Sequence, residues 1–365
     1  MKAKAQVFRG AGKPFELTEF PIPKVESQGV LVKVEMASIC GTDLHIWHGK
    51  RHAPLPIILG HEAMGSIASK GDHVKTDSAG QPVDTGDRIT WSYIKPCGNC
   101  YYCNVLNDPA GCLNRFVYGL WVSCEAPPHL NGAFSEYIYL RPGTFFFRVP
   151  DDLPGNIVAP ANCALATMIN STERANITLN DVVIVQGCGP LGLYGIALAK
   201  ERGALRVIAL DVAEPRLEFA KIFGADVTIN VRGMREEEIW TRVRELTQSR
   251  GADVGLEASG VPDVIPLGLR LLRDGGRYVT VGPIFQGANA QIDLYNLIFK
   301  RITLIGTSRN NASHLQDGLV FLSRTKRKYP YEKVVGSSHP LAQIAEAFKA
   351  IDSRQVMRAA ITFQN

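Results

Sequence analysis

The sequence lacks the features that mark membrane-spanning and secreted proteins. No stretch approaches the ~20 uninterrupted apolar residues that a membrane-spanning helix requires. The first residues, MKAKAQVFRG, contain no apolar core and no small-residue cleavage site. We therefore predict no secretory signal, no membrane partner and a cytoplasmic location.

Repeats, low-complexity tracts and long linkers are also missing, and basic residues do not form a stripe. The net charge is +5, and the main basic cluster, RTKRK at 324–328, lies near the end of the chain. We interpret it as a solvated helix end and predict no nucleic-acid partner. With 365 residues, of which 45% are hydrophobic and 21% charged, the chain is too apolar for disorder and too long for one compact core. Two domains are expected.

The chain has only eight cysteines, and four of them lie within residues 97–112. Cys97, Cys100 and Cys103 are separated by two residues each, and Cys112 follows after eight. In a reducing cytosol, such a segment is more often a metal site than a disulfide framework. Four thiolates suit Zn²⁺ and leave no open position, so this zinc would be structural. The alternative is four unligated thiols in a loop rich in Gly, Asn and Pro.

The pattern of predicted strands, helices and turns divides the chain into three stretches. Up to about residue 160, short strand-like runs such as 30–40 alternate with Gly- and Pro-rich turns, which predicts a mostly β region. After about 305 a mixed pattern of strand and helix returns. Between them, short apolar runs recur with helix-like segments in most gaps, which predicts a parallel sheet with helices on both sides. These runs are 181–186, 206–211, 226–230, 253–258, 276–282 and 302–307.

A glycine-rich segment, GCGPLG, follows the first of these runs and precedes a helical pattern. Gly187 permits a tight turn, Gly189 lets the backbone approach a pyrophosphate, and Gly192 lets the helix pack on the strand. With Pro190 and Leu191 between them, these residues are predicted to bind a dinucleotide. The alternative is a glycine-rich turn with no ligand.

Asp211 ends the next strand-like run, nineteen residues after Gly192. Its carboxylate is placed to accept hydrogen bonds from the adenosine ribose, and its charge would repel a 2′-phosphate. We therefore predict NAD as the cofactor. Arg216 lies close by and could accommodate a phosphate, so residual use of NADP stays open.

A third group of residues lies in the β-rich half. Cys40 and His61 supply a sulfur and an imidazole, which suit zinc. A catalytic zinc needs three protein ligands and an open position, and Cys163 is the best candidate for the third. Taken alone, Cys163 is better explained as a small buried hydrophobe.

Together these motifs resemble the zinc-dependent medium-chain alcohol dehydrogenases, over essentially the whole chain. The thiols of residues 97–112 match the structural-zinc lobe of that family. Its zinc signature is matched at Gly60, His61, Glu62, Gly65, Gly71 and Val74. The resemblance implies an α/β protein in which a GroES-like, mostly β catalytic domain is combined with a Rossmann domain. The implied boundaries are 1–164 for the catalytic domain with its lobe at about 95–115, 165–304 for the cofactor domain, and 305–365 for a return to the catalytic domain.

The resemblance also implies roles for individual residues. Cys40, His61 and Cys163 correspond to the catalytic zinc ligands, with Glu62 beside the metal as a neighbouring or transient ligand. Thr42 is expected to hydrogen-bond the alcohol oxygen, and His45 to pass the proton toward solvent. The family positions that line the substrate channel fall on Trp47 and Tyr93, with Trp91 nearby in sequence.

The activity implied is that of an NAD-dependent zinc alcohol dehydrogenase, with two zinc ions per chain and a homodimer or homotetramer as the assembly. Hydride would pass between an alcohol and NAD, giving an aldehyde or ketone. Polyol and threonine dehydrogenases usually have glutamate at the third ligand position, so Cys163 favours simple alcohols. Two alternatives stay open: a zinc-free NADPH-dependent enone or quinone reductase on the same scaffold, and a non-catalytic nucleotide-binding relative. The role of segment 113–137 is also open.

Overall fold

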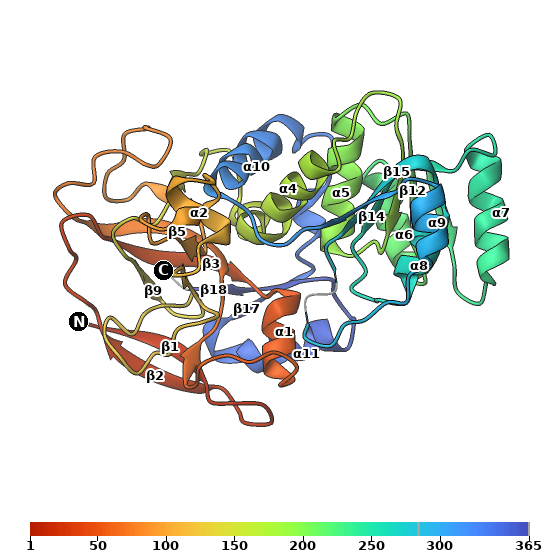
Figure 1. Cartoon of the computed structure of the whole chain (residues 1–365). Coiled ribbons are helices and arrows are strands. Elements are labelled where there is room, and N and C mark those ends of the chain that lie inside the picture. Colours follow the sequence, from red (N-terminus) through yellow and green to blue (C-terminus); the bar gives the residue numbers. More distant parts are fainter. Residues whose placement is uncertain (283–284, 364–365) are drawn as a thin grey trace. The chain divides into compact units, whose positions relative to one another are not determined.

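The computed structural model describes residues 1–282 and 285–363, and the chain divides into two compact units (Figure 1). The first unit comprises Met1–Ala166, Asn310–Lys326 and Tyr331–Asn365. The second comprises Thr167–Arg309 and Arg327–Pro330. Both candidate thiol clusters lie in the first unit, and the glycine-rich loop lies in the second.

The first unit is built mainly from antiparallel strands. Its largest sheet has the order β10-β6-β5-β3-β18-β17, with β9 paired to β3. The strands of this sheet are β3 (Val30–Ser38), β5 (Glu62–Lys70), β6 (Arg88–Trp91), β9 (Tyr137–Leu140), β10 (Phe146–Arg148), β17 (Ser337–Pro340) and β18 (Ala359–Thr362). Two smaller sheets join β2 (Glu16–Pro21), β1 (Lys2–Phe8) and β4 (Ile57–Ile58), and β7 (Ile94–Lys95) with β8 (Phe116–Val117).

Short helical segments connect these strands. The α-helices of this unit are α1 (Gly41–Trp47), α2 (Tyr101–Asn104), α3 (Gly155–Val158), α10 (Ala312–Thr325) and α11 (Ile344–Asp352), while α4 (Ala166–Arg174) begins at its boundary. Further single turns cover Pro109–Gly111, Ala161–Leu165, Tyr331–Lys333 and Leu341–Gln343. Among them, α1 and the π-helical turn Ala161–Leu165 each carry a candidate zinc ligand. Neither is long enough to show helical periodicity in the sequence, so the prediction of a mostly β half overlooked both.

The last part of the chain completes the large sheet of the first unit. Strand β18 pairs antiparallel with β3, so that Ala360 lies opposite Ser38. Strand β17 then pairs parallel with β18. This return brings side chains near residue 360 to the end of β3, next to the segment that holds Cys40.

The second unit is a six-stranded sheet in the order β13-β12-β11-β14-β15-β16, and all its strand pairs are parallel. Its strands are β11 (Val182–Gln186), β12 (Arg206–Asp211), β13 (Val227–Asn230), β14 (Ala252–Glu257), β15 (Leu272–Thr280) and β16 (Thr303–Gly306). This is the strand order of a Rossmann sheet. Its helices are α5 (Pro190–Glu201), α6 (Glu214–Ile222), α7 (Glu236–Leu246), α8 (Val264–Arg270) and α9 (Leu294–Phe299). The predicted fold class is therefore confirmed.

Burial explains why the predicted strands and helices of this unit form where they do. All five residues of β11 are buried, as expected for the centre of a parallel sheet. In α7, Ile239 and Val243 are buried on one face, and three glutamates occupy the first turn, where the helix dipole favours negative charge. Within the described residues, none of the helices combines the length and the apolar character needed to cross a membrane.

Candidate active site

Cys40, His61, Glu62 and Cys163 converge on one point of the first unit. One sulfur, nitrogen or carboxylate oxygen from each lies within 4.8 Å of the others. Cys40, His61 and Glu62 are buried, and Cys163 is partly buried. The structure therefore brings together the three residues predicted to hold a catalytic zinc, along with the predicted neighbour.

Strand pairing produces this convergence. Strands β3 and β5 run antiparallel with Ser38 opposite Glu62, so the residues after β3 and before β5 lie at the same end of the sheet. Cys40 then caps the N-terminus of α1. Gly60, just before His61, has φ +93, and a Cβ there would lie 2.8 Å from the Phe134 ring. Only glycine fits this tight approach.

The pKa values of the two thiols of this cluster are shifted in opposite directions. A hydrogen bond from the Cys163 thiol lowers the pKa of Cys40 well below its ordinary value, with further help from the charge of His61. The same hydrogen bond, together with burial, raises the pKa of Cys163 well above its ordinary value. The lowered pKa favours the thiolate form of Cys40, which is the form that binds metal ions.

A buried carboxylate that the sequence predictions did not include lies beside His61. Burial alone would lower the pKa of His61, but the charges of Asp43 and Cys40 outweigh it and raise that pKa well above 6.5. Asp43 Oδ1 lies 3.4 Å from His61 Nδ1, and its other oxygen accepts a hydrogen bond of 2.8 Å from the Cys40 amide. Asp43 occupies the N3 position of α1, three residues after the cap, which is the signal that could have identified it.

Glu62 is fixed by two partners at its Oε2 atom. Arg358 forms a buried ion pair with this oxygen, and the Ser38 hydroxyl also donates to it. Oε1 of Glu62 is buried and has no hydrogen-bond partner among the described residues. Burial raises the pKa of Glu62 to about 8, against the opposing charge of Arg358. Nothing in the sequence pointed to Arg358, which lies 296 positions from Glu62.

These donors fit a zinc ion. Two sulfurs and an imidazole are a ligand set that zinc favours; Cys40 and His61 are buried, and Cys163 is partly buried. The only other nearby donor among the described residues is the carboxylate of Glu62, one oxygen of which lacks a hydrogen-bond partner. A set of three ligands leaves room for one more oxygen on the metal.

The other predicted residues of the first unit lie around this cluster or in the neighbouring core. Thr42 and His45 follow Cys40 on α1; Thr42 is buried and His45 is partly buried. The Tyr93 ring lies 5.3 Å from the imidazole ring of His61, edge to face. Trp47 packs on Phe348 at 5.6 Å between ring centroids. Trp91 is fully buried at the end of β6, so its ring belongs to the core.

The second thiol cluster joins Cys97, Cys100, Cys103 and Cys112, as their spacing predicted. Their sulfurs lie within 4.8 Å of one another, with a Cys97–Cys112 distance of 3.4 Å and a Cys100–Cys103 distance of 3.5 Å. The amide of Cys103 donates to Cys100 and lowers the pKa of that thiol to about 6. Burial instead raises the pKa of Cys112 to about 11. Four converging thiols fit a zinc ion with no position left for a substrate.

The glycine-rich loop of the second unit has the conformation that its sequence predicted. Gly187 has φ +92, and a Cβ there would lie 2.5 Å from Cα of Ser259. A Cβ at Gly192 would lie 1.8 Å from the Gly187 carbonyl oxygen, so this position needs glycine to pack α5 on β11. Gly189 caps α5, with Pro190 and Leu191 in its first turn, and a Cβ on Gly189 would meet no atom within 4 Å.

Asp211 lies at the end of β12, and its carboxylate is hydrogen-bonded to this loop. Its Oδ2 accepts a hydrogen bond of 2.7 Å from the Cys188 amide, and its Oδ1 accepts one of 2.9 Å from the Ala213 amide. Each carboxylate oxygen can accept a further hydrogen bond, so both remain usable by a ligand. Arg216 on α6 is close enough for its charge to act on the Cys188 thiol.

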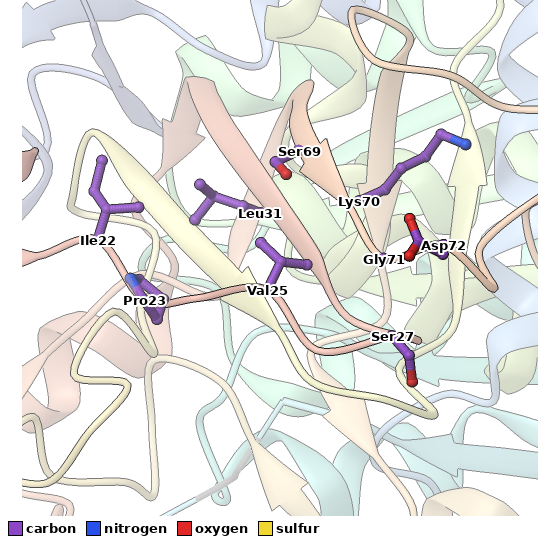
Figure 2. Close-up of a pocket in the computed structure, with 9 residues that line it drawn as sticks. All are labelled: Ile22, Pro23, Val25, Ser27, Leu31, Ser69, Lys70, Gly71 and Asp72. Atoms are coloured by element: carbon purple, nitrogen blue, oxygen red, sulfur yellow. The ribbon is translucent and has the colours of Figure 1, made fainter.

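A separate surface hollow of about 460 Å³ lies on the first unit (Figure 2). Lys70 lines this hollow, and its ammonium group already donates a hydrogen bond of 2.9 Å to the Val74 carbonyl. The hollow contains neither thiol cluster and none of the aromatic residues predicted to line the substrate channel. Its lining residues are Ile22, Pro23, Val25, Ser27, Leu31, Ser69, Lys70, Gly71 and Asp72.

Two protein families match separate parts of the chain. The alcohol dehydrogenase GroES-like domain matches residues 26–151, and the zinc-binding dehydrogenase family matches residues 190–324. The chain belongs to the zinc-dependent medium-chain alcohol dehydrogenase family. As a member, it is an oxidoreductase of small molecules, and zinc and a nicotinamide cofactor are the cofactors that its family implies.

Individual members of this family resemble the chain over most of its length. It is 31% identical to 5-exo-hydroxycamphor dehydrogenase of Pseudomonas putida over 348 residues, or 95% of each chain. It is 32% identical to L-threonine 3-dehydrogenase of Francisella tularensis over 315 residues, or 84% of each. The solved structure of an alcohol dehydrogenase from Thermotoga maritima covers all of both chains, with a TM-score of 0.95 and 32% identity.

Proposed function

We propose that the protein is an NAD-dependent zinc alcohol dehydrogenase that oxidises a simple alcohol to an aldehyde or ketone. The observation that carries this proposal is the convergence of Cys40, His61 and Cys163 on one buried point beside the carboxylate of Glu62. A zinc-free reductase on the same scaffold would have no use for that ligand set. A protein that only bound nucleotides would have no use for it either.

The metal would be held by Cys40, His61 and Cys163, and when bound it would supply a Lewis acid that lowers the pKa of the alcohol hydroxyl. Two further residues would position the side chains around the metal. Arg358 holds Glu62 at one oxygen, which keeps the carboxylate beside the metal ligands. Asp43 orients the imidazole of His61.

Removal of the hydroxyl proton is assigned to Thr42 and His45. Partial burial, followed by the nearby charge of Lys50, lowers the pKa of His45 below 6.5. His45 is therefore neutral at pH 7 and able to accept a proton. Thr42 lies two residues after Cys40 and would hydrogen-bond the alcohol oxygen. Below the lowered pKa, His45 is protonated and alcohol oxidation should slow.

The cofactor would bind on the loop of residues 187–192, with its pyrophosphate at the N-terminus of α5. The open space above Gly189 supports this placement, because a backbone without side chains lets the phosphates approach. NAD is proposed over NADP because of the carboxylate of Asp211, whose charge disfavours a 2′-phosphate.

Asp211→Asn is expected to relax the preference for NAD about 10-fold. Asparagine keeps one oxygen that can accept from a loop amide, but it loses the charge that repels a 2′-phosphate. A 10-fold change in preference corresponds to the loss of about 1.4 kcal/mol of repulsion. The ratio of kcat/KM for NAD and NADP measures the change. Arg216→Gln in the same background should restore the preference for NAD, because it removes the candidate partner of the phosphate. An unchanged ratio in Asp211→Asn would count against the proposed ribose role.

The second zinc ion is proposed for the lobe of Cys97, Cys100, Cys103 and Cys112. Its four sulfurs make a closed set, so its contribution would be to stability and not to catalysis. Strands β7 and β8 flank this lobe in the sequence, and they pair with each other at its base. Few apolar side chains of the lobe itself are buried, so metal binding would replace a core there.

The substrate is proposed to be a small apolar alcohol. Tyr93, which contacts the ring of His61, and Trp47 on α1 would form the apolar walls beside the metal, and the buried Trp91 would support them from the core. The named relatives act on 5-exo-hydroxycamphor and L-threonine, and the cysteine at position 163 favours the first kind of substrate. A cyclic alcohol is therefore the first type to try.

We also propose a cytoplasmic homo-oligomer that associates through the edge of the second unit. Helix α9 exposes four large apolar side chains, and β16 ends the sheet. An open strand edge can pair antiparallel with its own copy about a two-fold axis. A mass near 39.9 kDa in light scattering would contradict this assembly. The four side chains are Leu294, Tyr295, Ile298 and Phe299.

The function is tested by screening primary, secondary and cyclic alcohols with the zinc-loaded full chain and NAD. We expect alcohol-dependent appearance of reduced cofactor, strongest with a cyclic or apolar secondary alcohol. Enones and quinones with NADPH serve as the matched alternative substrates. Reduction of these compounds without any alcohol oxidation would overturn the proposal.

A further inference from the structure

A buried asparagine lies directly beside a candidate zinc ligand and binds the backbone of another. Asn162 precedes Cys163 in the turn Ala161–Leu165, and its side chain is 0% exposed. Its Nδ2 donates to the carbonyl oxygens of His61 at 3.0 Å and Trp91 at 3.1 Å. Both partners can only accept, so the amide nitrogen must face them. The Asn162 side chain therefore ties the turn of Cys163 to the backbone of His61.

A second buried asparagine holds the first. Asn310 is 1% exposed, and its Nδ2 donates to the carbonyl oxygen of Asn162 at 3.3 Å. It stands where the chain re-enters the first unit, just before α10. Helix α10 in turn packs against the turn Ala161–Leu165. The backbone that carries Cys163 is thus held by Asn162 on one side and by Asn310 on the other.

The adjacent residue, Asn311, binds the four-thiol lobe. Its Oδ1 accepts a hydrogen bond of 2.8 Å from the Ala110 amide, and its Nδ2 lies 3.4 Å from Asp108 Oδ1. Both partners lie in the chain segment between Cys103 and Cys112. Two consecutive asparagines therefore bond to chain segments that carry the two thiol clusters: Asn310 to the residue before Cys163, and Asn311 to the segment before Cys112.

We propose that Asn162, Asn310 and Asn311 form a positioning link that couples metal binding at the two clusters. The proposal rests on the proposed function, which assigns a zinc ion to each cluster. Metal binding in the lobe would order its chain and thereby fix Asn311. Because Asn310 and Asn162 would then be fixed as well, less conformational entropy is lost when Cys163 and His61 bind a metal ion. Such coupling is reciprocal, so metal in either cluster favours metal in the other.

The positioning role of Asn162 is tested with Asn162→Asp in the full chain. The new carboxylate oxygen would face two carbonyl oxygens and repel them, while the size of the side chain stays the same. Partners that orient metal ligands are worth about 10–100-fold in metal affinity. We therefore expect iodoacetamide to label Cys40 and Cys163 at least about 10-fold faster in zinc-loaded Asn162→Asp than in the zinc-loaded wild type. The lobe thiols should stay protected.

Gln6→Glu is the matched control. Gln6 is also a buried amide of the first unit, and it donates to the Leu341 carbonyl at 3.0 Å. Loss of that hydrogen bond can lower stability, but it should leave the labelling rates of Cys40 and Cys163 unchanged. Equal acceleration in Gln6→Glu would mean that labelling reports general loosening, and it would overturn the positioning role.

The link to the lobe is tested with Asn311→Asp, which keeps a good N-cap for α10 but loses the donor that faces Asp108. We expect Cys40 and Cys163 to be labelled several-fold faster although the lobe keeps its metal. Rates equal to the wild type would overturn the coupling. If Asn162→Asp does not fold, Asn310→Asp takes its place, because it removes the hydrogen bond to the Asn162 carbonyl.

The labelling rates with and without zinc separate loss of the positioning link from absence of the metal itself. If wild-type Cys40 and Cys163 are labelled as fast with zinc as without it, no metal is held there, and both proposals are overturned. If zinc protects them in the wild type and equally in Asn162→Asp and Asn311→Asp, only the positioning link is overturned.

Discussion

Cys163→Ser is expected to lower the rate of NAD-dependent alcohol oxidation at least about 10³-fold. A Lewis-acid metal is worth several kcal/mol to the transition state, and each 1.36 kcal/mol is a factor of about ten. Serine has nearly the size of cysteine, but its hydroxyl does not ionise near pH 7 and is a poor ligand for zinc. The fold should remain, since Cys163 is only partly buried. The measurement is kcat/KM, together with the zinc content of the variant.

Cys124→Ser provides the matched control for this experiment. Cys124 is a buried free thiol of the same unit that contacts the Pro56 carbonyl at 3.4 Å, outside both clusters. Its substitution should leave activity and zinc content within about two-fold of the wild type, since it alters no metal ligand. Near wild-type activity in Cys163→Ser would show that the third ligand has been wrongly assigned.

Gly189→Ala is expected to weaken NAD binding about 10- to 100-fold without loss of stability. A Cβ at position 189 would meet no protein atom within 4 Å, so the free protein accommodates it. The methyl group would instead occupy the space through which the pyrophosphate approaches, and overpacking of 1–3 kcal/mol corresponds to that range. Calorimetric titration with NAD measures the affinity, and a thermal melt measures the stability.

Two further alanine variants of the same unit sharpen this test. At Gly192 the Cβ would overlap the Gly187 carbonyl oxygen at 1.8 Å, so Gly192→Ala should lower the melting temperature as well as NAD affinity. At Gly306 the Cβ would meet nothing within 4 Å, and alanine there should change neither. Wild-type affinity in Gly189→Ala would place the pyrophosphate elsewhere.

Local pattern and resemblance predicted much of the architecture. The parallel strands of the second unit were visible because each is a short apolar run, as in β11, where every residue is buried. The strands of the first unit were clear in type, as in β3, but their pairing was not. Helix α1 was missed, because seven residues make only two turns.

The candidate site was predictable only where it depended on residue type and spacing. Cysteine and histidine stand out chemically, so Cys40 and His61 could be found. Cys163 needed the family resemblance, because a lone cysteine among apolar residues carries no signal of its own. Arg358 and Asn162 could not be found, because their roles depend on contacts across 296 and 101 positions of the chain. Such contacts exist only after β18 and β5 have joined β3.

Anomalous diffraction at the zinc edge, from crystals of the purified full chain, shows directly whether each thiol cluster holds a zinc ion. We expect two peaks per chain, one among Cys40, His61 and Cys163 and one among the four thiols of the lobe. A single peak in the lobe, with Cys40 and Cys163 free of metal, would contradict it.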